Sequence, residues 1–168
     1  FNIHIQDPKV SLNNFDLVVV PEHDSLAGKN IITSKGAIHY LTLDEIKINH
    51  DYLLDKLNKN KDYLLLVLGG PNKYYDYDDQ SLLSIFIKIK KILDKNDLQA
   101  IVIPSMRTPE KTINLANEHF GKENLVINSV DKKAYLSALS LSKYIVVTCD
   151  STSMISEAAL TGKPIYIA

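Results

Sequence analysis

The sequence has a single cysteine, Cys149, which excludes a disulfide within the chain and a metal site built from several cysteines. It also has no apolar run of the roughly 18 residues that a membrane-spanning helix needs. Its formal net charge of -1 gives no broad basic field for nucleic acid. We therefore expect a cytoplasmic globular protein that does not bind nucleic acid.

Arginine is as rare as cysteine, because Arg107 is the only one among 19 basic residues. A planar guanidinium can grip a phosphate or a carboxylate with two parallel hydrogen bonds, which a lysine cannot do. Arg107 is therefore a candidate anion-binding residue. An ordinary surface arginine without such a role is an equally weighted alternative.

Apolar segments of strand length alternate with amphipathic, helix-like segments from residue 63 onward. This alternation is typical of a Rossmann-type α/β domain, with a parallel sheet, right-handed crossovers and helices on both faces. Thr108 and Pro109 suit the start of one of the helices. The strands are predicted at 63–68, 98–103, 125–127 and 144–148, and the helices at 82–93, 109–120, 134–141 and after Ser151.

The first 62 residues follow a less regular pattern. Thr42 and Glu45 have the spacing of a capping box, which predicts a helix start there and a helical pattern over 43–57. Short strands are predicted at 3–5, 15–20 and 30–33.

These patterns predict three segments. Residues 1–42 are expected to be the C-terminal end of a truncated Rossmann-like domain, 43–62 an interdomain connection, and 63–168 a second Rossmann-like domain. Because the sequence starts at Phe1 and stops inside an apolar segment, we expect it to be a fragment cut at both ends.

Polar or small residues follow most of the predicted strands. In open α/β sheets, ligands bind beyond the carboxyl ends of the strands, so these residues are the candidates for a site. They are Asp7 after the strand at 3–5, Pro21, Glu22, His23 and Asp24 after 15–20, Gly69, Gly70, Pro71 and Asn72 after 63–68, Ser105, Arg107 and Thr108 after 98–103, and Asp150, Ser151 and Ser153 after 144–148.

The last group opens a helix. Free amides and the helix dipole at such a start attract phosphate, and the hydroxyls of Ser151 and Ser153 add donors. Glu157 lies four residues after Ser153 on the same helix face, where its carboxylate could accept ribose hydroxyls. We favour this diphosphate-and-ribose site over the alternative, in which the serines only cap the helix and Glu157 is solvated.

Other candidates are less specific. Gly69-Gly70 would let the backbone approach a ligand closely, or it is only a tight turn. Glu22-His23-Asp24 could supply a histidine for proton transfer oriented by carboxylates, or it is an ordinary polar loop. Tyrosines that could stack on a base or sugar, or simply cover a helix end, occur at 74, 75 and 77.

The arrangement of these motifs resembles that of the mitochondrial-fission "elongated mitochondria" family. The resemblance spans nearly the whole chain, and its most specific block runs from Asp150 to Glu157, followed by Gly162-Lys163-Pro164. The family includes plant proteins and bacterial homologues that carry the label of predicted nucleoside-diphosphate-sugar epimerases. In this chain Met106 stands before Arg107, where relatives often have a second basic residue.

The resemblance implies a GT-B-like fold that binds a UDP- or GDP-linked sugar. Gly69, Gly70, Ser151 and Ser153 would hold the diphosphate, Arg107 would neutralise it, Glu157 would hold the ribose, and His23 with Glu22 or Asp24 would act as acid–base group. Ser105, Thr108 and Asp150 belong to the same binding region. No metal and no further cofactor is required. The expected activity is glycosyl transfer or sugar-nucleotide epimerisation. The alternative is a non-catalytic interaction protein that acts at the surface of a membrane with a protein partner.

Overall fold

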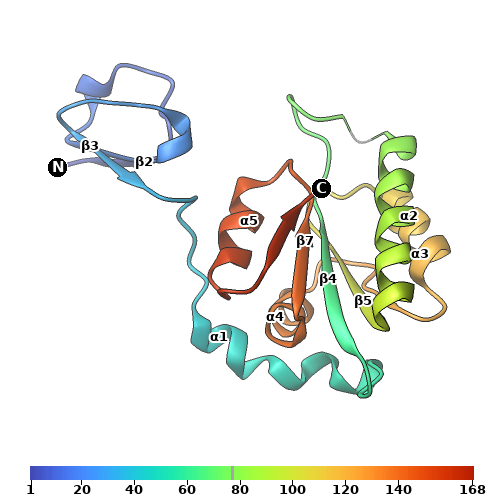
Figure 1. Ribbon diagram of the computed structural model, residues 1–168. Coiled ribbons are helices and arrows are strands. Elements are labelled where there is room, and N and C mark those ends of the chain that lie inside the picture. The colour runs from blue at the N-terminus through green and yellow to red at the C-terminus, as the bar shows by residue number, and fades with distance from the viewer. Residues whose placement is uncertain (77) are drawn as a thin grey trace. The chain divides into compact units, whose positions relative to one another are not determined.

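The computed structural model describes residues 1–76 and 78–168, and the chain divides into two compact units, Phe1–Tyr40 and Leu41–Ala168 (Figure 1). Each unit has a parallel sheet of its own. Residues 43–62, expected to connect two domains, fall inside the second unit.

The first unit is a three-stranded parallel sheet in the order β1-β2-β3. The central strand is held by the buried side chains of Val18 and Val20. A short 3-10 helix, η1, spans Leu12–Asn14, and a second, η2, spans Glu22–Asp24 directly after the central strand. The strands are β1 (Ile3–Ile5), β2 (Leu17–Pro21) and β3 (Ile31–Ser34).

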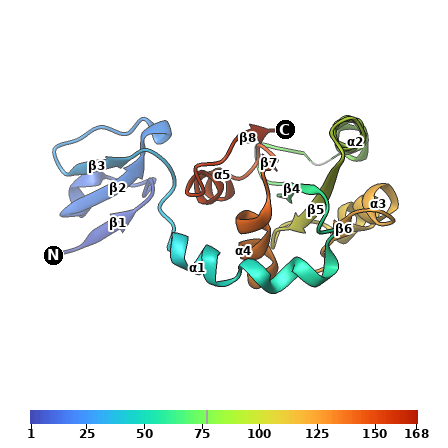
Figure 2. The ribbon, with the colours of Figure 1, turned by 60° about the horizontal axis from the view of Figure 1, so that its bottom comes forward.

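The second unit is a five-stranded, fully parallel sheet in the order β6-β5-β4-β7-β8. Helices α2 and α3 cover one face, and α4 and α5 cover the other, as the end-on view in Figure 2 shows. The strands are β4 (Asp62–Leu68), β5 (Leu98–Pro104), β6 (Leu125–Val126), β7 (Tyr144–Val147) and β8 (Ile165–Ile167). The helices are α2 (Asp79–Asn96), α3 (Glu110–Phe120), α4 (Lys132–Leu141) and α5 (Thr152–Ala159).

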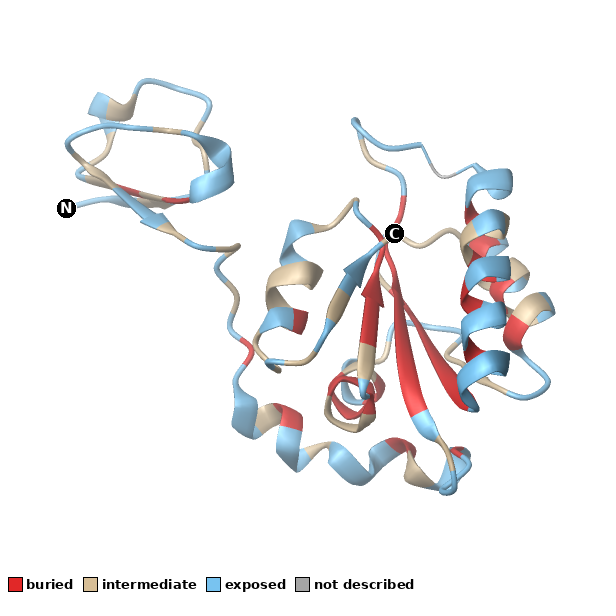
Figure 3. Ribbon diagram, in the orientation of Figure 1, coloured by how far each residue is buried: buried red, intermediate tan, exposed pale blue. Residues whose placement is uncertain are grey.

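The core of the second unit lies on both faces of this sheet, because alternate residues of each strand point to opposite sides. The central strands are buried along their length (Figure 3). On β4, Leu65 and Val67 pack with the side of α4, whereas Leu64 and Leu66 pack with Phe86 on the α2 side. The sequence therefore has continuous apolar runs in these strands, as parallel sheets require.

The helical pattern predicted over 43–57 is interrupted. Helix α1 (Leu43–Ile48) begins with the predicted capping box of Thr42, but a 3-10 helix, η3 (His50–Lys56), replaces its continuation. The buried hydroxyl of Ser137 on α4 accepts the Leu53 amide and donates to the His50 carbonyl. This tertiary contact stabilises the tighter turn, and the local sequence does not reveal it.

A second difference concerns the start of α3. The N-cap is Pro109, and the Thr108 hydroxyl predicted to cap the helix instead donates to the carbonyl oxygens of Leu68 and Gly69, 2.8 and 2.6 Å away. These contacts join the loop after β5 to the end of β4. Thr108 therefore stabilises the packing of two strand ends and does not cap the helix.

Candidate functional site

The sheet of the second unit has a topological switch point between β4 and β7. The chain leaves β4 for β5 on one side and later returns to place β7 on the other side. In open α/β sheets the connections then diverge, and the crevice at the carboxyl ends of the two strands is the usual ligand site. Three of the predicted groups of site residues, those after β4, β5 and β7, lie at this edge.

Asp150 is the centre of the hydrogen bonds at this edge. Its side chain is only 1% exposed. One carboxylate oxygen accepts the Thr148 hydroxyl at 2.6 Å. The other accepts the Gly70 amide at 3.0 Å and the Arg107 guanidinium at 2.8 Å. Asp150 therefore joins the loops that follow β4, β5 and β7.

Gly69 and Gly70 do permit a close approach, and the groups that approach them belong to the same chain. A Cβ on Gly69 would lie 2.0 Å from the Asp150 carboxylate, and one on Gly70 would lie 2.0 Å from the Arg107 carbonyl oxygen. Both positions exclude a side chain for this reason. Their amides donate to the Thr148 hydroxyl and the Asp150 carboxylate, and a contact of this backbone with a ligand stays a prediction.

Arg107 extends across the site from the loop after β5. Its guanidinium donates to the Gly70 carbonyl at 3.1 Å as well as to the Asp150 carboxylate, yet the side chain is still 40% exposed. The arginine thus combines a fixed position with access to solvent, which an anion-binding residue needs. Met106, next to it, is 89% exposed.

The loop that carries Arg107 is itself braced. The Ser105 amide donates to the Thr108 hydroxyl at 2.8 Å, and the two hydroxyls lie 3.1 Å apart. The Ser105 hydroxyl also accepts the Arg107 amide at 3.3 Å. Ser105 and Thr108 therefore shape the loop from within.

Helix α5 begins directly after Asp150. Ser151 is its N-cap, and its hydroxyl accepts the Met154 amide at a long 3.5 Å. Thr152 and Ser153 in the first turn are exposed. The predicted helix start with hydroxyls is confirmed as local structure, with one serine used for capping and Ser153 facing solvent.

Glu157 is half-buried on α5 and faces Tyr135 on α4. Burial, followed by the charge of Glu157, raises the pKa of the Tyr135 hydroxyl well above its ordinary value. The tyrosine oxygen is buried, and among the described residues it has no hydrogen-bond partner of good geometry. The Glu157 carboxylate therefore lies next to a protonated tyrosine hydroxyl.

One residue of this site, Thr148, was absent from the sequence-based candidates, whereas Asn72 was among them. The buried Thr148 hydroxyl accepts the Gly69 amide at 2.8 Å, and the Asn72 side chain donates to the Asp150 carbonyl at 3.1 Å. Asn72 also accepts the amides of Tyr74 and Tyr75. A hydroxyl that ends an apolar strand could have indicated Thr148, whereas nothing local indicates the partner of Asn72.

A small cavity of about 140 Å³ opens at the same edge. Tyr75 lines it, which is compatible with the predicted stacking role. Tyr74 is exposed nearby in the chain, and Tyr77 lies outside the described residues. The other lining residues are Asp76, Asp78, Ser81, Leu82, Ile85, Thr148, Cys149, Asp150 and Ala168.

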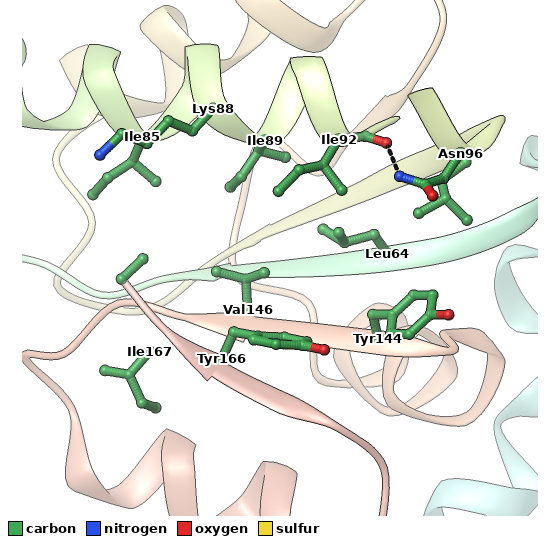
Figure 4. Close-up of a pocket in the computed structure, with 12 residues that line it drawn as sticks. Leu64, Ile85, Lys88, Ile89, Ile92, Asn96, Tyr144, Val146, Tyr166 and Ile167 are labelled. Carbon is green, nitrogen blue, oxygen red and sulfur yellow. Dashed lines mark hydrogen bonds between the residues drawn. The ribbon is translucent and has the colours of Figure 1, made fainter. Parts of the chain in front are cut away.

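A larger groove, of about 660 Å³, runs between α2 and the face of β7 and β8 (Figure 4). Its walls include Ile85, Ile89 and Ile92 on α2 and Tyr144 and Tyr166 on the strands. Most of this lining is apolar, so the groove offers few groups for chemistry. It is the kind of surface that a parallel sheet buries under another layer, and we place the candidate site at the polar edge.

The third predicted group lies in the first unit. Glu22, His23 and Asp24 form η2 at the carboxyl end of β2, with the His23 ring nitrogen 3.7 Å from the Asp24 carboxylate. The His23 side chain is 47% exposed. The structure thus brings these three residues together with one another, and their relation to the second unit stays a prediction.

Two kinds of feature are not found in the described part of the chain. Within 1–76 and 78–168, no cluster of three or more His, Cys, Asp or Glu side chains is arranged to hold a metal ion. Nor do these residues form a helix long and apolar enough to cross a membrane.

Comparison with known proteins identifies relatives over the full chain. The model of a family described as "Mitochondrial fission ELM1" matches residues 1–168. The uncharacterized protein RP120 of Rickettsia prowazekii is 24% identical over an alignment that covers 98% of this chain and 56% of the relative. The mitochondrial fission protein ELM1 of Arabidopsis thaliana is 25% identical, with 99% of this chain and 45% of the relative covered. The chain thus spans about half the length of these curated relatives.

A solved structure described as "S. aureus MnaA-UDP co-structure" is similar, with a TM-score of 0.56. The likeness covers 90% of this chain and 41% of that one at 16% sequence identity. At this identity it concerns the fold, and it confirms the predicted GT-B-like α/β class.

Proposed function

This chain belongs to the mitochondrial fission ELM1 family, and we propose that it binds a UDP- or GDP-linked sugar at the strand-end edge of its second unit. One observation carries the proposal. The guanidinium of the only arginine is fixed on Asp150, the residue directly before the N-cap of α5. A cation and a helix start therefore lie together at a topological switch point, and both favour a phosphate group. The similar structure of an MnaA-UDP complex adds support.

In this proposal the diphosphate lies over the first turn of α5. The amides of that turn and the hydroxyls of Ser151 and Ser153 donate to its oxygens, and Arg107 neutralises part of its charge. Gly69 and Gly70 allow the loop after β4 to approach, and Ser105, Thr108 and Asp150 complete the binding region. The supporting fact is that Ser153 and Arg107 are both accessible to solvent.

Glu157 is proposed to accept the ribose hydroxyls. It follows Ser153 by one helical turn, so the two side chains share one face of α5. Its carboxylate faces the protonated hydroxyl of Tyr135, whose pKa is raised by burial and by Glu157. A carboxylate with a weak partner retains the acceptor capacity that two ribose hydroxyls require.

The reaction we propose is glycosyl transfer or epimerisation of the sugar nucleotide. Both reactions can proceed by departure of the nucleoside diphosphate, whose developing charge Arg107 would stabilise without a metal. His23, with Glu22 or Asp24, is proposed as the acid–base group supplied by the first unit. Histidine is the side chain that most often transfers protons in enzymes near neutral pH.

Calorimetry against UDP, GDP and their sugar conjugates tests binding, and proton NMR of the bound conjugate tests turnover. The proposal expects binding together with conversion or hydrolysis of one conjugate. Binding without any turnover would favour a regulatory ligand on a non-catalytic protein that recruits partners at a membrane. The name of the Arabidopsis relative, a mitochondrial fission protein, motivates that second candidate. No binding at millimolar ligand would contradict the proposal.

A further inference from the structure

The carboxylate of Asp150 is fully engaged by groups of its own chain. With only 1% of its side chain exposed, one oxygen is held by Thr148 and the other by Gly70 and Arg107. A buried carboxylate would also repel a diphosphate, and here the guanidinium of Arg107 offsets that charge. Asp150 is thus poorly placed to touch a ligand and well placed to arrange the groups that do.

Hydrogen bonds through Asp150 connect Gly69 and Thr148 on one side with Arg107 on the other. Thr148, only 3% exposed, donates to Asp150 and accepts the Gly69 amide. Asp150 in turn fixes Arg107 directly beside the N-cap of α5. Without the carboxylate, the long arginine side chain would lose this charged partner, and only weaker bonds to backbone carbonyls such as that of Gly70 would restrict its rotamers.

We propose that Asp150 is a positioning residue, which fixes the Arg107 guanidinium and the loop of Gly70 beside the ligand and does not contact the ligand itself. This inference rests on the proposed binding of a nucleoside diphosphate. It assigns Asp150 a different role from that of Ser153 and Glu157, with which the sequence alone grouped it. By the same inference, the buried Thr148 hydroxyl helps to position Arg107, because it donates to the Asp150 carboxylate.

The test is a double-mutant cycle on UDP affinity, measured by calorimetry with Asp150→Asn, Arg107→Ala and the double variant. If Asp150 acts through Arg107, each single variant weakens UDP binding about tenfold, and the double variant is no weaker than Arg107→Ala alone. Uridine, which lacks the diphosphate, should bind all four proteins with equal affinity. Independent, multiplying losses would show that Asp150 contacts the ligand and would overturn the inference.

Thr148 supplies a second test that leaves Asp150 in place. Thr148→Val removes the hydroxyl and should weaken UDP binding about fivefold, whereas Thr148→Ser keeps it and should restore affinity to within about twofold of the wild type. Equal affinities of the valine and serine variants would contradict the role of this hydroxyl.

Failure of the proposed function gives a different result. If the wild type binds neither UDP nor GDP at millimolar concentration, that function is wrong, and the same cycle is then measured on the urea midpoint of unfolding. If the changes in urea midpoint caused by Asp150→Asn and Arg107→Ala are not additive, the result supports the inference that this pair of residues holds the loops together. Additive shifts would overturn it.

Discussion

Asp150 and Gly69 show how a site residue can depend on one far away in the sequence. The carboxylate occupies the space that a side chain at position 69 would need, and it binds the amide of residue 70 across 80 positions. The pair of glycines is visible in the sequence, and a close approach of some group to it could be predicted. That the group is Asp150 could not, because no local pattern links residues so far apart.

Gly69→Ala should therefore destabilise the second unit. The added Cβ would lie 2.0 Å from a buried carboxylate, so the loops must separate, at a cost of about 1–3 kcal/mol in the free energy of unfolding. Gly28→Ala is the control, because there the nearest atom, at 3.3 Å, is the tip of the Ile31 side chain. Urea denaturation measures both. A Gly69→Ala protein as stable as the wild type would contradict the described packing.

Glu157→Ala should weaken UDP binding about tenfold, because a lost hydrogen bond to a charged group is worth roughly 1.5 kcal/mol or more. The matched control is Glu118→Ala, which changes an exposed carboxylate on α3. UDP whose ribose lacks its 2′ and 3′ hydroxyls should bind the wild type and Glu157→Ala with equal affinity in calorimetry. A remaining difference with that ligand would assign Glu157 a purely structural role.

At the scale of elements, helix starts were predicted best where a side chain caps its own helix. Thr42 and Ser151 both act as N-caps, because such bonds span only three residues. The predictions failed where a tertiary partner competed for the group. Thr108 binds the end of β4 in place of its helix, and Ser137 favours a 3-10 turn over a continued α1.

Helix α4 carries a testable cap of this kind. The Asp131 carboxylate accepts the Ala134 amide at 3.1 Å and the Tyr52 hydroxyl at 2.9 Å, so it also ties η3 to α4. Asp131→Ala should cost about 1–2 kcal/mol of unfolding free energy, and Asp131→Asn less, because an amide can still cap. Asp55→Ala changes an exposed residue of η3 and serves as control. Equal loss in the alanine variants at 131 and 55 would refute the cap.

The same residue predicts a pH dependence. Burial pushes the pKa of the Asp131 carboxyl upward, but its hydrogen bonds with Ala134 and Tyr52 outweigh burial and keep the pKa below its ordinary value. A pKa that is lower in the folded state gives stability that is present above the unfolded pKa, about 3.9, and is lost as the pH falls through the folded value. Urea midpoints of the wild type should therefore drop more steeply below about pH 4 than those of Asp131→Asn. Parallel curves would contradict this.

At the scale of the whole molecule, the alternation of strands and helices sufficed to predict a parallel sheet with helices on both faces. The boundary between the two units was harder to predict from the sequence. The helical segment after Thr42 has the pattern of a connection, but in the structure its Leu53 packs in the core of the second unit. The sequence also predicted which strand ends carry polar groups. It could not show that Asp150 and Arg107 form an ion pair there, since that depends on how three loops meet.

The central claim is that a nucleoside diphosphate binds at the start of α5 beside Arg107. Calorimetry with UDP and GDP on the wild type, Arg107→Ala, Ser153→Ala and the control Ser84→Ala, an exposed serine of α2, tests it most directly. We predict a Kd below about 1 mM for one nucleotide, a loss of about tenfold in Arg107→Ala, a smaller loss in Ser153→Ala and no change in the control. Absence of binding, or binding that neither variant weakens, would contradict the claim.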